Sequence, residues 1–230
     1  MTPHTPHRRR AALAAAAALA ITLTGCSVDF PDSYEPTPIP DTDNRQTIAS
    51  AHEELKTIPV KGRAPKTGYS RDEFGQRWAD VDHDGCDQRN QVLARDLTDV
   101  SYASPASCRV ISGTLADPFT GASIDFQRGQ DTSNDVQIDH TVALSNAWQT
   151  GAQQLTDDER EQLANDPDNL RAVDGPTNAA KGDGDAATWL PPNRAHWCDY
   201  AASQTLVKAE YDLWMTPAEH DRIETILTDC

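Results

Sequence analysis

An aspartate and a histidine stand side by side at Asp139 and His140, after Val136 and Ile138, which alternate with polar neighbours. This alternation predicts a half-buried strand that ends at the Asp-His pair beside a turn. A carboxylate next to an imidazole suits metal-assisted hydrolysis, because the acid can hold a divalent cation while the neutral imidazole takes a proton from water. The pair alone is weak evidence, since most histidines do no chemistry.

A second strand and a short helix are predicted downstream of this pair. Residues 169–173 have the composition of a short strand, and Gly175-Pro176 then turns the chain into a helix. This helix carries Asn178 and, one turn later, Lys181. The predicted order of strand, strand and helix therefore places one ligand-type residue on the first strand and another on the helix.

The combination of Asp139-His140, Asn169 and Asn178 resembles the signature of the HNH endonucleases of the ββα-metal class. The similarity is to a secreted bacterial branch related to the C-terminal nuclease domains of modification-dependent restriction enzymes. It extends through most of residues 50–230. The resemblance implies an α+β fold with a ββα-metal core and hydrolysis of phosphodiester bonds in nucleic acid, DNA before RNA.

The resemblance also implies a role for each residue of the pattern. His140 would be the general base, Asp139 and Asn178 would be the metal ligands, and Lys181 would contact a phosphate. Asn169 would brace the loop between strand and helix without touching the metal. The third signature residue is Asn178 where many relatives have a histidine. Two oxygen ligands suit Mg²⁺ or Mn²⁺ better than zinc, so one of these hard cations is the expected cofactor.

The stretch 80–91 allows three interpretations. Gly85 and the acids before it fit the first half of a calcium-binding loop, but Gln91 stands where a bidentate glutamate is expected. In the family that the chain resembles, a Gly-Cys-x-x-Arg-Asn stretch opens a helix near the site, which would turn Arg89 toward the substrate phosphate. The third interpretation is a helix start whose acids favour the helix dipole. The acids concerned are Asp80, Asp82 and Asp84.

The charge of the chain opposes a nuclease function at first sight. The formal net charge is −16, and it becomes −19 without residues 1–25, which hold three arginines and no acid. Affinity for nucleic acid comes largely from basic residues that neutralise phosphates. The distribution of charge matters more than its sum, so we expect weak, metal-dependent and salt-sensitive binding. Basic residues available around the motif are Arg89, Arg171, Lys181 and Arg194.

The first 46 residues are predicted to export the chain and tether it. Three arginines precede the apolar run 11–23, which indicates a signal peptide over residues 1–25. Leu23-Thr24-Gly25-Cys26 resembles a bacterial lipobox, so Cys26 is the expected lipidation site. An ordinary signal peptide cut near Gly25 is the alternative. Residues 26–46 are predicted to be a Pro-rich linker and residues 47–230 the nuclease domain. The predicted location is the extracellular face of a bacterial membrane through a lipid anchor, or the medium if the lipobox is not used.

Four cysteines remain after Cys26, an even number that favours two disulfides in an exported chain. Three connectivities are possible. We predict the connectivity whose two bonds join neighbouring elements, Cys86 with Cys108 and Cys198 with Cys230. A zinc site is disfavoured because no CxxC spacing occurs.

Other segments are expected to frame the motif. Residues 109–115 and 123–127 read as a β-hairpin, and residues 193–214 and 217–227 as a C-terminal helical hairpin closed by Cys230. Helices are also predicted over residues 48–55, after Ser70, and over residues 156–164.

The sequence therefore predicts a metal-dependent endonuclease with no evident protein partner. The alternative is a non-catalytic extracellular module that binds calcium or nucleic acid. A nuclease that has lost its turnover and only binds would share the fold.

Overall fold

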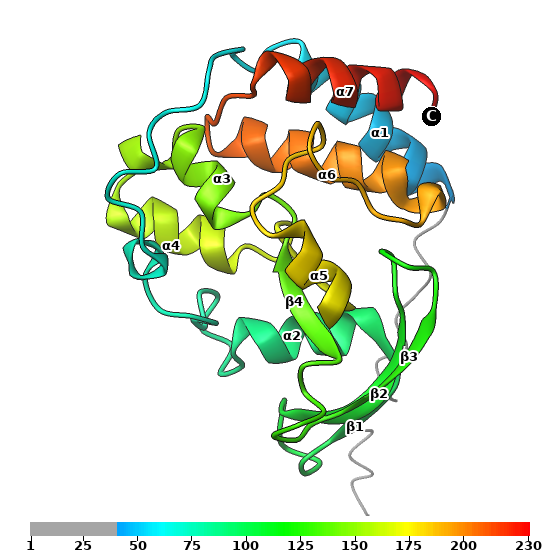
Figure 1. Cartoon of the computed structure of the whole chain (residues 1–230). Helices are drawn as coiled ribbons and strands as arrows, with labels where there is room; N and C mark the ends of the chain where they lie inside the picture. Colours follow the sequence, from blue (N-terminus) through cyan, green and yellow to red (C-terminus); the bar gives the residue numbers. More distant parts are fainter. Residues whose placement is uncertain (1–40) are drawn as a thin grey trace, which may run out of the picture. The chain divides into compact units, whose positions relative to one another are not determined.

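A computed structural model describes residues 41–230, which form mixed α and β structure (Figure 1). The predicted signal peptide, Cys26 and most of the predicted linker lie outside the described residues. Within the described range, no helix combines the length and apolar character that crossing a membrane requires. The elements in chain order are α1 (Asp41–Leu55), η1 (Arg71–Phe74), α2 (Gln88–Asp96), β1 (Leu97–Tyr102), β2 (Val110–Ala116), β3 (Ser123–Gln127), β4 (Val136–His140), α3 (Leu144–Gln149), η2 (Ala152–Gln154), α4 (Asp157–Asn165), β5 (Leu170–Asp174), α5 (Gly175–Lys181), η3 (Arg194–His196), α6 (Trp197–Glu210) and α7 (Pro217–Thr228).

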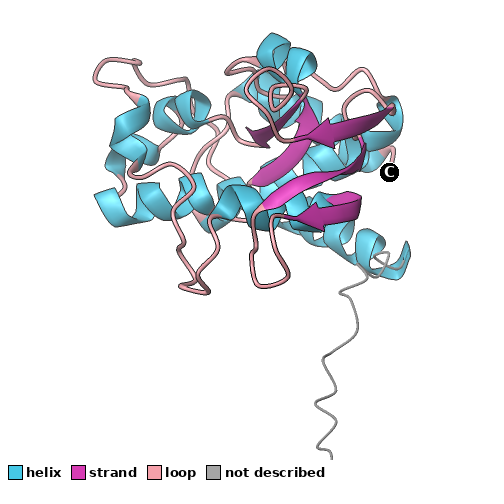
Figure 2. Ribbon diagram, turned by 90° about the horizontal axis from the view of Figure 1, so that it is seen from below, coloured by secondary structure: helices cyan, strands magenta, loops and turns pink. Residues whose placement is uncertain are grey.

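The strands of the described residues form two antiparallel sheets (Figure 2). Strands β2 and β3 pair as the predicted hairpin, so that prediction is confirmed. Strand β1 adds a third member at the edge and was not predicted. Only Leu97 of its six residues is buried, which explains why its sequence lacks the apolar alternation of a core strand. Strands β4 and β5 form the second sheet, in which His140 pairs with Leu170 and Val136 pairs with Asp174.

Helix α2 shares one apolar core with both sheets. Asp87 caps its first turn by accepting a hydrogen bond from the Asn90 backbone N–H at 2.9 Å. Burial of the apolar side chains holds β4 and β5 against the larger sheet through α2, so the end of β4 is fixed in place. The buried core residues include Val92, Leu93, Leu115, Phe126, Ile138 and Ala172.

Helices α1, α6 and α7 form a second, helical core (Figure 1). A capping box at Thr216 opens α7, and the Cys198–Cys230 disulfide joins the start of α6 to the chain end. The predicted C-terminal helical hairpin and its disulfide are thus confirmed. Between the helices, the buried Lys208 ammonium lies 2.5 Å from the buried Glu219 carboxylate.

Three predicted helix boundaries were wrong. Helix α1 begins at Asp41 rather than residue 48, so it includes the end of the predicted linker. Helix α6 stops at Glu210 rather than near residue 214, because Asp212 adopts a left-handed conformation with φ of 50°. Ser70 makes no side-chain capping bond, and only the 3₁₀ turn η1 follows, since Gly75 turns left-handed with φ of 65°.

The acidic helix after Thr156 and the remaining disulfide agree with the sequence. Thr156 and Glu159 form the predicted capping box of α4. The Cys86–Cys108 disulfide joins the loop before α2 to the segment that enters β2, which confirms the second predicted pair. Both disulfides therefore connect neighbouring elements of the fold.

Candidate active site

The Asp-His pair lies at the C-terminal end of β4, and the chain enters α3 four residues later. Successive side chains of a strand point in opposite directions, so Asp139 and His140 find their partners on different sides of β4. Both still border one pocket of about 460 Å³ at the strand end. Asn178 of α5 borders it as well. Strand, strand and helix thus bring together the three residues that the sequence assigned to base and metal ligands.

The imidazole of His140 is fixed through Nε2, which lies 2.9 Å from the carbonyl oxygen of Ala164 in α4. A carbonyl only accepts, so Nε2 carries the proton and Nδ1 is the basic nitrogen. The indole of Trp78 stacks on the ring with centroids 6.1 Å apart and planes 12° from parallel. Burial lowers the pKa of His140 to about 3, although the hydrogen bond to the Ala164 carbonyl acts in the opposite direction, so the ring is neutral at physiological pH.

Asn169 is fully buried beside the turn that follows β4. Its Oδ1 accepts a hydrogen bond from the Val142 backbone N–H at 2.8 Å, and its Nδ2 donates to the Leu163 carbonyl at 3.1 Å. Its own carbonyl accepts from the Thr141 N–H at 2.7 Å. These bonds tie the residues directly after His140 to α4, and no atom of Asn169 borders the pocket.

Asp139 is almost fully buried and is held by Lys181. The Lys181 ammonium lies 2.8 and 2.6 Å from the two carboxylate oxygens, and it also donates to the His140 carbonyl at 2.6 Å. Burial raises the pKa of Asp139 and lowers the pKa of Lys181, while each charge opposes the shift of the other. The ammonium is engaged with β4 and does not border the pocket of His140. A direct phosphate contact by Lys181 therefore stays a prediction that this placement disfavours.

Asn178 is oriented by Gln137, whose Oε1 accepts a hydrogen bond from Asn178 Nδ2 at 3.0 Å. With the nitrogen so engaged, Oδ1 is left as an acceptor beside the pocket. The Asp139 carboxylate and the Asn178 amide oxygen are hard donors of the kind that Mg²⁺ and Mn²⁺ prefer, and the pocket has room for water. Asp139 and Asn178 would therefore be the residues that hold a divalent cation, and the Asp139 carboxylate is also hydrogen-bonded to Lys181.

Three pocket residues, Lys66, Tyr69 and Arg71, were missed by sequence reasoning, because they come from a segment without a recognisable motif. Lys66 and Arg71 bring positive charge to the pocket, and Asp183 accepts hydrogen bonds from Ser145 at 2.9 Å and from Lys66 at 3.1 Å. The only sequence signal was the run of basic residues between 61 and 77. The rest of the lining comes from the motif itself, on or next to its predicted first strand and helix: Ile138, Ala143, Leu144, Ala179 and Gly182.

Arg89 lies elsewhere. It is partly buried on α2 and its Nη2 donates to the Val136 carbonyl at 3.4 Å, at the start of β4 rather than at the end that carries Asp139 and His140. Arg89 does not border the pocket. Its predicted phosphate contact is not supported by this placement.

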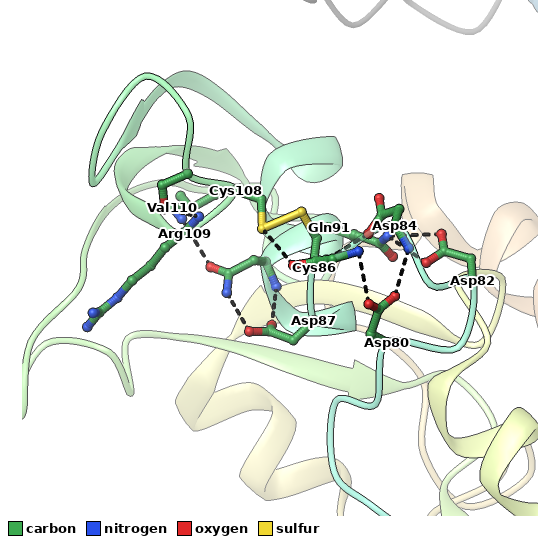
Figure 3. The surroundings of a disulfide bond; sticks show 12 residues. Asp80, Asp82, Asp84, Cys86, Asp87, Gln91, Cys108, Arg109 and Val110 are labelled. Carbon is green, nitrogen blue, oxygen red and sulfur yellow. Dashed lines mark hydrogen bonds between the residues drawn. A yellow bond between two sulfur atoms is a disulfide. The ribbon is translucent and has the colours of Figure 1, made fainter.

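The acidic loop before α2 is closed by its own hydrogen bonds (Figure 3). The Asp80 carboxylate accepts from the backbone N–H groups of Asp84 and Gly85 at 3.1 and 2.9 Å. Gln91 donates to Asp82 at 3.0 Å. Gln91 stands where a calcium loop has a glutamate, and its neutral amide supplies no negative charge to a cation. One oxygen each of Asp80, Asp82 and Asp84 lie within 4.8 Å of one another. Calcium binding here stays a prediction.

Comparison with known proteins identifies the family. Residues 87–225 match the model of the C-terminal domain of GmrSD restriction endonucleases. An uncharacterized secreted protein of Arthroderma benhamiae is 37% identical over 197 residues, which cover 85% of this chain and 92% of the relative. No solved structure matches. The chain belongs to the family of the C-terminal domain of GmrSD restriction endonucleases, a nuclease-related family.

Proposed function

We propose that the protein is an HNH-type, metal-dependent endonuclease that hydrolyses phosphodiester bonds in DNA, with His140 as general base. The observation that carries this proposal is the 2.9 Å contact between His140 Nε2 and the Ala164 carbonyl. It assigns the proton to Nε2 and leaves Nδ1 as a neutral base beside a polar pocket. Membership of a nuclease-related family supports the substrate class.

The described residues can divide the work of the reaction. His140 Nδ1 takes the proton of the attacking water, and the carbonyl of Ala164 stabilises the imidazolium that forms. Asp139 and Asn178 would hold the cation, which supplies positive charge to the scissile phosphate and to the leaving oxygen. Asn169 positions the turn after His140 through its bonds to Val142 and Leu163, so the base keeps its place.

The place of action is proposed to be outside the cell. The relative in Arthroderma benhamiae is called a secreted protein, and two disulfides suit an oxidising compartment. A lipid anchor on Cys26 is part of the proposal because residues 23–26 resemble a lipobox. Cys26 lies outside the residues that the structure describes.

The test is plasmid and single-strand cleavage at low salt with Mg²⁺, Mn²⁺, Ca²⁺ or chelator. We expect cutting with Mg²⁺ or Mn²⁺, none with chelator, and a rate lower by about 10²–10⁴-fold in His140→Asn. His83→Asn is the matched control, because His83 is exposed in the acidic loop away from the pocket. Unchanged turnover in His140→Asn overturns the base assignment. A folded protein that fails to cut with any of the metals tested, yet gains stability from calcium, supports the binding-module alternative.

A further inference from the structure

Residues 61–78, here called the cationic segment, differ in charge from the rest of this acidic chain. They contain five of the twenty lysines and arginines and only two acids. The segment also lies outside residues 87–225, the part that matches the family model. Its five basic residues are Lys61, Arg63, Lys66, Arg71 and Arg77.

The cationic segment is fastened to the side of the active site. The Ala64 N–H donates to the Gln149 carbonyl at 2.8 Å, and the Trp148 indole N–H donates to the Thr67 carbonyl at 3.3 Å. The Tyr69 ring packs edge-on against Trp148 with centroids 6.2 Å apart. These contacts join the segment to α3, which follows β4 directly, so its side chains are held at fixed positions relative to His140.

Two residues of the segment reach the catalytic centre. Arg71 borders the same pocket as Asp139 and His140, and its positive charge opposes protonation of His140. Trp78 stacks on the His140 ring. The segment thus contributes to the site both the Arg71 cation and the Trp78 ring that packs against the imidazole of His140.

Arg71 is an unusual cation for this protein. It is partly buried, its Nη1 makes a long 3.4 Å hydrogen bond to the Phe74 carbonyl, and among the described residues no carboxylate lies within ion-pair distance of it. Burial and the neighbouring charge of Arg77 both lower the pKa of Arg71, while Tyr69 and the Asp72 carboxylate oppose that shift. A partly desolvated guanidinium beside a like charge is stabilised by an anion that hydrogen-bonds to it. Its unused donors match a phosphate in geometry and charge.

Lys66 contrasts with Arg71 in a useful way. Its ammonium pairs with Asp183 at 3.1 Å, and both side chains are about half exposed. Exposed pairs of this kind contribute little stability, so a nearby phosphate can replace the carboxylate as partner. Lys66 is therefore a secondary member of the same anion site, and Arg71 is the primary one.

We propose that the cationic segment is the phosphate-binding edge of the active site, with Arg71 as the residue that contacts a backbone phosphate of the nucleic acid next to the bond cut. This inference rests on the proposed endonuclease function. It also bears on how a chain of net charge −16 can hold a polyanion, because two cations of the segment, Lys66 and Arg71, border the pocket where the substrate must lie.

The test is binding of a fluorescein-labelled DNA duplex by the full-length protein with Mg²⁺ present, over a series of salt concentrations, with every protein carrying His140→Asn so that cleavage is slow during the measurement. Arg71→Gln is expected to raise Kd roughly tenfold and to reduce the slope of log K against log salt by about 0.9. Arg109→Gln is the matched control. It removes the same charge from an exposed side chain that points away from the disulfide into solvent, and Arg109 does not border the pocket (Figure 3).

Two further arms keep the result interpretable. Arg71→Lys retains the charge but not the fork of donors, so it is expected to keep most of the salt slope while losing affinity. If Arg71→Gln fails to fold by circular dichroism, Arg71→Lys and a Lys66→Gln variant carry the test. A Kd and slope for the Arg71 variants equal to those of Arg109→Gln overturn the proposal. The proposal is also overturned if Arg71→Gln changes the inhibition of DNA cleavage by inorganic phosphate but has no effect on DNA binding.

Failure of this inference and failure of the proposed function give different results. Normal metal-dependent cutting with no role for Arg71 in binding overturns the inference alone. If DNA binding depends on Arg71 but the protein fails to cut with any of the metals tested, the endonuclease function is overturned and the phosphate site is upheld.

Discussion

The Nε2 atom of His140 lies 2.9 Å from the carbonyl oxygen of Ala164. His140 is the last residue of β4, and Ala164 lies near the end of α4. The helix predicted over residues 156–164 therefore supplies the group that orients the proposed base. The acceptor fixes the tautomer, and the tautomer fixes which ring nitrogen can take a proton.

The pH dependence of cleavage follows from the environment of His140. A general base works in its neutral form, and burial lowers the pKa of His140 to about 3. We expect no loss of kcat/KM from protonation of this residue between about pH 8 and pH 5. The measurement is the pH–rate profile at saturating metal. A descending limb centred near 6.5, the ordinary value for histidine, contradicts this environment.

The same shift predicts a pH dependence of stability. Since the folded-state pKa of His140 is below its unfolded value of 6.5, the unfolded chain takes up the proton first as the pH falls. The contribution of His140 to the free energy of unfolding is therefore complete above pH 6.5 and is lost progressively toward pH 3. Urea unfolding at several pH values should show a weaker decline in His140→Asn. An identical decline in wild type and variant counts against burial of the neutral ring.

Removal of the Asn178 amide should weaken metal binding without unfolding the protein. Asn178 is only partly buried, and its Nδ2 bonds to Gln137. Asn178→Ala is expected to raise the Mg²⁺ concentration for half-maximal cleavage at least about tenfold, a loss that mutation of even the outer partners of metal ligands can cause. Gln137→Ala should cause a smaller increase, because it only frees the amide to rotate. The exposed Asn134→Ala is the control. An unaltered Mg²⁺ requirement in Asn178→Ala shows that the ligand is misassigned.

The Lys181–Asp139 pair should be a stability element as well as part of the site. Both side chains are buried, at 0% and 6% exposure. Lys181→Met leaves an uncompensated buried carboxylate, so the free energy of unfolding should fall by about 3–5 kcal/mol. Adding Asp139→Asn should restore part of the loss, with a coupling energy of about 1–3 kcal/mol. Denaturant unfolding of the four proteins measures this cycle. Unchanged stability with weaker DNA binding in Lys181→Met would instead favour the phosphate contact.

The Cys198–Cys230 disulfide should stabilise the fold without affecting the chemistry. It links residues 32 apart and joins α6 to the chain end, and neither cysteine borders the pocket. The double variant Cys198→Ala/Cys230→Ala is expected to lose about 3–4 kcal/mol of unfolding free energy. Its kcat at a temperature where it is folded should match wild type. A large fall in kcat under those conditions would mean that the helical hairpin controls the site.

The sequence alone determined the parts of this protein whose signals are local. The alternation before Asp139, the Gly-Pro turn before Asn178 and the capping boxes at Thr156 and Thr216 each act within a few residues, and the elements that these four signals predicted are present. The capping pattern at Ser70 is the exception, since only a 3₁₀ turn follows it. The even cysteine number and the choice of neighbouring elements were also sufficient for the disulfides.

Only the tertiary structure decided which partners the functional groups have. The ammonium of Lys181 meets Asp139 across 42 residues of sequence, and the carbonyl that orients His140 is 24 residues away. Arg71 borders the pocket because its segment packs on α3, and no periodicity in the sequence records that contact. Such interactions depend on how distant elements pack, and packing is set by the whole buried core rather than by neighbours along the chain.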